Sequence, residues 1–103
     1  MPTARRHPYT LDVETTSALP GHELIEPGRA DLADGRASIA ALLVSIGAPR
    51  LRALGLEIPT TLDEPELALY RLLQTTHGDG AHSQYNALVR RLVSFERALA
   101  CAK

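Results

Sequence analysis

The side chains best suited to hold a metal ion lie in one short, glycine-containing segment. His77, Asp79 and His82 fall within six consecutive positions, and imidazole and carboxylate groups are common ligands of zinc and other divalent cations. The spacing H-x-D-x-x-H matches no strict ligand motif, however, and a turn explains Gly78 and Gly80 equally well. We therefore expect a turn here and no cofactor, with a metal-binding protein that uses this loop as an alternative.

Glu96 is a carboxylate that a helical pattern places on an apolar face. At 100° per residue it falls between four aliphatic residues of its own helix, namely Val89, Leu92, Val93 and Leu99. A charge in such a place is costly unless it is paired. One interpretation is a buried carboxylate that acts as an acid, a base or a ligand. The others are an ion pair with an arginine such as Arg36, Arg50 or Arg52, or a position at the edge of the core.

Three polar residues on the outer side of the same helix could bind a partner. Asn86, Arg90 and Arg97 share one side of a helix that continues to about Cys101, and Arg91 lies beside them. A strip of arginines can bind phosphate groups or an acidic protein, although a solvated face has the same pattern. We assign these residues to a candidate interaction surface.

Segment 39–54 resembles a helix-turn-helix only loosely. Two helices are expected there, separated at Gly47, with Arg50 and Arg52 on the second. Pro49 near the start of the second helix and the spacing of apolar residues fit this motif poorly. A net charge of −1 also argues against a dedicated nucleic-acid-binding protein. A DNA-binding regulator is therefore an alternative, and nucleic acid ranks below a protein as partner.

The N-terminal segment 1–22 is predicted to form an extended arm. Tyr9, Leu11 and Val13 alternate with polar residues, which is the period of a β-strand. A lone strand is not stable by itself. It must lie across the helices, pair with a second chain, or stay disordered, and an exchanged arm would allow a homodimer.

The rest of the chain, 23–103, is predicted to be an all-α domain. Helices are expected over 28–46 with a weak point at Gly35, over 49–54, over 63–75, and from Asp79 or Ser83 to about Cys101. The last has a clear inner face of Tyr85, Leu88, Leu92, Phe95 and Leu99. The predicted fold is a compact bundle of about four helices, one of them short, with an extended N-terminal arm.

Composition and motifs limit which cellular compartment and which class of function we expect. The 103 residues include a single cysteine, which excludes an internal disulfide and is typical of a reducing compartment. No apolar run is long enough to cross a bilayer, so we expect a cytoplasmic protein without a membrane partner. No nucleophile elbow or phosphate-binding loop is present. The leading hypothesis is a small, non-catalytic protein–protein interaction or regulatory protein.

Overall fold

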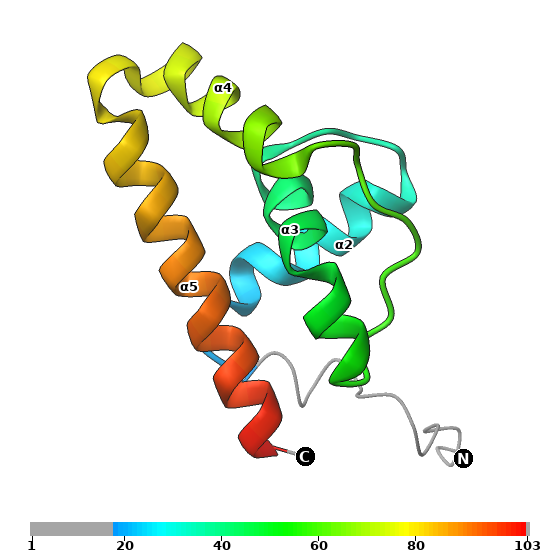
Figure 1. Ribbon diagram of the computed structural model, residues 1–103. Coiled ribbons are helices and arrows are strands. Elements are labelled where there is room, and N and C mark those ends of the chain that lie inside the picture. The colour runs from blue at the N-terminus through cyan, green and yellow to red at the C-terminus, as the bar shows by residue number, and fades with distance from the viewer. Residues whose placement is uncertain (1–17, 103) are drawn as a thin grey trace.

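The computed structural model describes residues 18–102, and within that range the chain is helical with no β-strand. The predicted all-α fold is confirmed. Its elements are α2 (His22–Ala33), α3 (Ile39–Ala53), α4 (Pro65–His77), the short 3₁₀-helix η2 (Gly78–Gly80) and α5 (Ala81–Ala102) (Figure 1). Residues 18–102 contain four α-helices, but the boundaries of the first two differ from the prediction.

The first predicted helix is two helices. Residues 34–38 separate α2 from α3, and Gly35 there has a φ of 78°, a conformation that glycine adopts without strain. Ser38 begins α3 as its N-cap: its hydroxyl accepts from the Ala41 N–H at 3.0 Å and donates to the Asp31 carboxylate at 2.6 Å. The predicted weak point was therefore correct. The predicted start at Gly28 was wrong, because α2 begins at His22 and continues through Pro27.

The predicted break at Gly47 is absent, and α3 continues through Gly47 and Pro49 to Ala53. This removes the expected second helix at 49–54. Gly47 instead allows α5 to approach α3 closely. A Cβ atom at this position would lie 2.8 Å from a Leu92 methyl and 3.0 Å from a Glu96 oxygen.

The core forms around α3, which contributes eight buried residues. From α5 it receives Leu92, Phe95 and Leu99, all three from the predicted inner face. The loop between α3 and α4 is held by two side chains of α3. The Ser45 hydroxyl accepts from the Leu62 N–H at 3.1 Å, and the Arg52 guanidinium donates to the Ile58 carbonyl at 3.0 Å.

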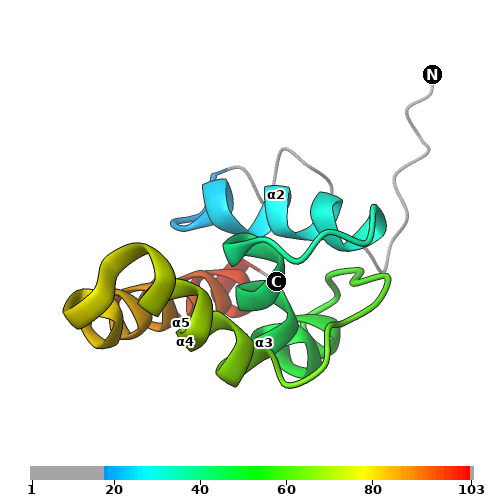
Figure 2. The same cartoon turned by 90° about the horizontal axis from the view of Figure 1, so that it is seen from above.

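The arrangement leaves the two sides of the molecule different. Figure 2 shows α2 lying on one side of the layer that contains α3, α4 and α5. Within this layer, α4 and α5 form a hairpin. The side of the hairpin that faces away from α2 is not covered by α2. Across residues 18–102, no helix combines the length and the apolar character needed to cross a membrane.

Candidate functional site

The predicted interaction residues lie together on the outer side of α5. Arg90 and Arg97 are exposed and Asn86 is half-buried. The two arginines are separated by seven residues, or roughly 10 Å along the helix axis. Neither forms a salt bridge with any other residue in the range 18–102. The Asn86 amide nitrogen lies 3.2 Å from His82 Nε2.

A shallow surface groove of about 500 Å³ borders this side of α5. Its lining comes from the start of α2 and the middle of α5: Pro20, Gly21, Ala87, Arg90, Arg91 and Ser94. Gly21 has a φ of 88°, and a Cβ atom there would lie 3.1 Å from the Arg91 carbonyl oxygen. Glycine therefore allows the chain both to turn into α2 and to contact α5 at this point.

The two arginines of the groove differ in their electrostatic surroundings. The Arg91 guanidinium forms a salt bridge with Glu23 of α2, which neutralises it within the fold. Arg90 has no carboxylate partner among the described side chains. Among residues 18–102, the groove therefore presents one guanidinium without a carboxylate partner, beside the small side chains of Ala87 and Ser94. Such a group donates paired hydrogen bonds to a carboxylate or a phosphate.

The candidate nucleic-acid residues Arg50 and Arg52 differ in their interactions. Arg52 is engaged with the Ile58 carbonyl, whereas Arg50 forms no salt bridge with another described residue. Both belong to the single helix α3. The two helices expected in segment 39–54 are one continuous helix, so that prediction was wrong. Gly47 does not end a helix there; it leaves room for the side chains of α5.

Glu96 is half-buried where α5 crosses α3. Burial raises the pKa of its carboxyl above the usual value, and the nearby Arg50 guanidinium partly opposes this shift by lowering the pKa. The structure thus brings one of the three expected arginines near Glu96 without a salt bridge between them. Its position at the border of the core is one of the sequence-based alternatives.

The candidate metal ligands do not converge. His77 ends α4, Asp79 lies in η2 and His82 lies in the first turn of α5, and all three side chains are exposed. Over residues 18–102, no three His, Cys, Asp or Glu side chains are grouped so as to hold a metal ion. The turn interpretation therefore fits this segment, with the turn wound as a 3₁₀-helix.

A pair of tyrosines was missed from the sequence. Tyr70 of α4 and Tyr85 of α5 pack edge to face, with ring centroids 6.0 Å apart and planes at 68°. Burial raises the pKa of the Tyr85 phenol, and the Glu66 carboxylate raises it further. Tyr70 lies eight residues before Gly78 and Tyr85 lies five residues after Gly80, so they are not equally far from the turn. Their pairing depends on how α4 and α5 pack, and no local spacing indicates it.

The remaining predicted interaction residues belong to the N-terminal arm. Tyr9, Leu11 and Val13 of the predicted arm lie outside the described residues. No protein-family model, no curated protein and no solved structure matches the chain.

Proposed function

We propose that this protein is a small, non-catalytic interaction or regulatory protein that binds an acidic segment of a partner protein on the outer side of α5. The observation that carries the proposal is the exposed Arg90 guanidinium beside the groove, which forms no salt bridge with another residue of 18–102. Arg91, its neighbour in sequence, is neutralised by Glu23. An exposed guanidinium that the described helices do not pair can donate hydrogen bonds to an incoming carboxylate.

An acidic peptide fits these features better than DNA does. Arg90 and Arg97 project from one helix only, and the chain as a whole carries a net charge of −1. The affinity of a protein for a duplex depends on many phosphate contacts, and these two arginines supply only a few. A short acidic segment requires only the groove and the two arginines. We place this function in the cytoplasm, as expected for a chain with a single cysteine.

Peptide binding measured by fluorescence anisotropy tests the proposal. The probe is a labelled glutamate-rich peptide, and a peptide of equal length with glutamine in place of glutamate is the comparison. Arg90→Glu and Arg97→Glu should each weaken binding by about tenfold, a loss typical of one charge-assisted contact. Raising the salt concentration should weaken binding by the wild-type protein.

The matched control is Arg71→Glu, which changes the same charge at an exposed position of α4. It should leave binding nearly unchanged. Equal losses for all three variants would show that only overall charge matters, and equal binding of the two peptides would show that acidic side chains are not recognised. Either result contradicts the proposal.

A further inference from the structure

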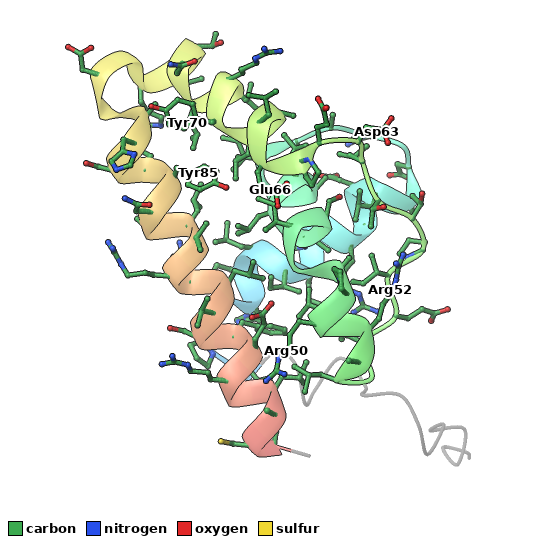
Figure 3. The ribbon with its side chains drawn as sticks, viewed as in Figure 1. Arg50, Arg52, Asp63, Glu66, Tyr70 and Tyr85 are labelled. Carbon is green, nitrogen blue, oxygen red and sulfur yellow. The ribbon has the colours of Figure 1, made fainter. Side chains whose placement is uncertain are left out.

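A second surface lies on the side of the molecule that α2 leaves open. Figure 3 shows Glu66 and Tyr70 of α4, Tyr85 of α5 and Arg50 of α3 along this side. Two more residues of α5 continue it, since Val89 is about one turn from Tyr85 and Glu96 about two turns further. We call this the tyrosine face. Its two tyrosines and Val89 are half-buried, so each keeps some apolar surface in contact with water.

The two exposed charges of the tyrosine face have opposite signs and lie at its opposite ends, and the half-buried Glu96 carboxyl lies near the Arg50 end. Glu66 lies beside the tyrosine pair, toward the α4 end, and Arg50 lies near the C-terminal end of α3 (Figure 3). Both side chains are exposed, and neither forms a salt bridge within the described part of the chain. A two-fold axis through the middle of such a face places each charge opposite its counterpart on a second copy.

We infer that a second copy of this chain docks on the tyrosine face, so that Glu66 of each protomer pairs with Arg50 of the other. The half-exposed rings of Tyr70 and Tyr85 and the side chain of Val89 then bury their apolar surface against the same residues of the partner. Tyrosine and arginine are the residue types that contribute most often to binding energy at protein interfaces. Charge complementarity sets the antiparallel register.

The dimension of the face limits the strength of the dimer. From Tyr85 to Glu96 the helix rises about 16 Å, so the contact is at the small end of specific interfaces. We therefore expect a dimer that dissociates on dilution. The groove at Arg90 lies on the other flank of α5, so a dimer would carry two open grooves. The dimer does not depend on the peptide-binding proposal.

Sedimentation velocity over a dilution series tests this inference through a charge swap. The wild-type protein should sediment as a dimer at high concentration and as a monomer at low concentration. Glu66→Arg should raise the dissociation constant by about tenfold, because it places like charges together. Arg50→Glu should do the same. The double variant, which restores opposite charges at the two ends, should recover most of the wild-type affinity.

Thermal unfolding and a control variant distinguish loss of dimerisation from loss of folding. Arg50→Glu brings a second carboxylate near Glu96, so thermal unfolding of each variant is recorded beside sedimentation. Arg71→Glu is the control and should dimerise like wild type. A monomer at all concentrations, a dimer indifferent to Glu66→Arg, or failure of the double variant to recover would overturn the inference. Peptide binding by the Glu66→Arg variant should persist, so the two proposals can fail separately.

Discussion

Gly28 allows α2 and α3 to pack closely, and a side chain at this position would collide with the backbone of α3. A Cβ atom at Gly28 would lie 2.4 Å from the Ala40 carbonyl oxygen and 2.6 Å from a Val44 methyl. Alanine would gain about 1 kcal/mol of helix propensity. Overpacking against backbone costs typically about 1–3 kcal/mol or more, so we expect Gly28→Ala to destabilise the protein in urea unfolding.

Gly47→Ala provides the comparison, because its Cβ would meet the ends of the Leu92 and Glu96 side chains rather than backbone. Those side chains can shift, so the loss should be smaller than for Gly28→Ala. Equal stability of wild type and Gly28→Ala would mean that α2 and α3 are further apart than described.

Glu96 predicts a dependence of stability on pH. Its pKa is raised on folding above the ordinary 4.5, so the folded state binds the proton more tightly than the unfolded state. The stabilisation is fully present below pH 4.5 and is lost as the pH rises through the higher folded pKa. Glu96→Gln should therefore be more stable than wild type at pH 7, by up to about 1 kcal/mol.

The difference between Glu96→Gln and wild type should shrink toward zero at pH 4, where the wild-type carboxyl is also largely neutral. Glu57→Gln, which removes an exposed carboxylate from the loop after α3, is the control for the loss of one negative charge. A Glu96→Gln variant that is less stable than wild type at pH 7 would show that the charged carboxylate stabilises the fold.

At the scale of elements, the turn between α2 and α3 depends on one hydroxyl. Ser38 caps α3 through the Ala41 N–H and also donates to the Asp31 carboxylate, so it links the two helices. Ser38→Ala removes both hydrogen bonds and should cost about 1–2 kcal/mol in thermal or urea unfolding. Ser38→Thr keeps the hydroxyl and should recover most of that stability. If both variants lose equally, the cap is not the cause.

The elements also show what sequence patterns can and cannot predict. The inner face of α5 was predicted correctly because Leu92, Phe95 and Leu99 follow helical periodicity within one segment. The start of α2 and the continuity of α3 were missed because Gly28 and Gly47 were interpreted as local helix boundaries. In the fold, both glycines remove a Cβ where another helix passes. That role depends on a distant segment, so no local pattern reveals it.

For the whole molecule, the same distinction separates the two candidate surfaces. Arg90 and Arg97 belong to one helix, so their shared side could be predicted from spacing alone. The groove beside them could not, because Pro20 and Gly21 reach α5 only through the packing of α2. The tyrosine face combines residues of α3, α4 and α5, so it exists only once these three helices have packed together. Long-range packing, and not residue type, determines which polar groups become neighbours.

The uneven distribution of buried side chains predicts where the molecule opens first. α3 contributes eight buried residues, whereas η2 contributes none and α5 contributes Ala81 and then none before Leu92. Segments with few buried contacts unfold locally at a lower free energy than the core. Amide hydrogen exchange should therefore be fast over 76–86, and slowest at Leu43, Val44 and Leu51, which should exchange only through global unfolding.

The exchange measurement also separates local opening from dimerisation. At protein concentrations where the dimer has dissociated, the hairpin tip should exchange at its fastest rate. At higher concentration, a second copy on the tyrosine face should slow exchange around Tyr85 and Val89 while leaving Thr76 and His77 unchanged. Glu66→Arg should shift that concentration dependence to protein concentrations about tenfold higher, without changing exchange in α3. Uniform protection along α4 and α5 at low concentration would contradict this account, because it would require the hairpin tip to be as stable as the core.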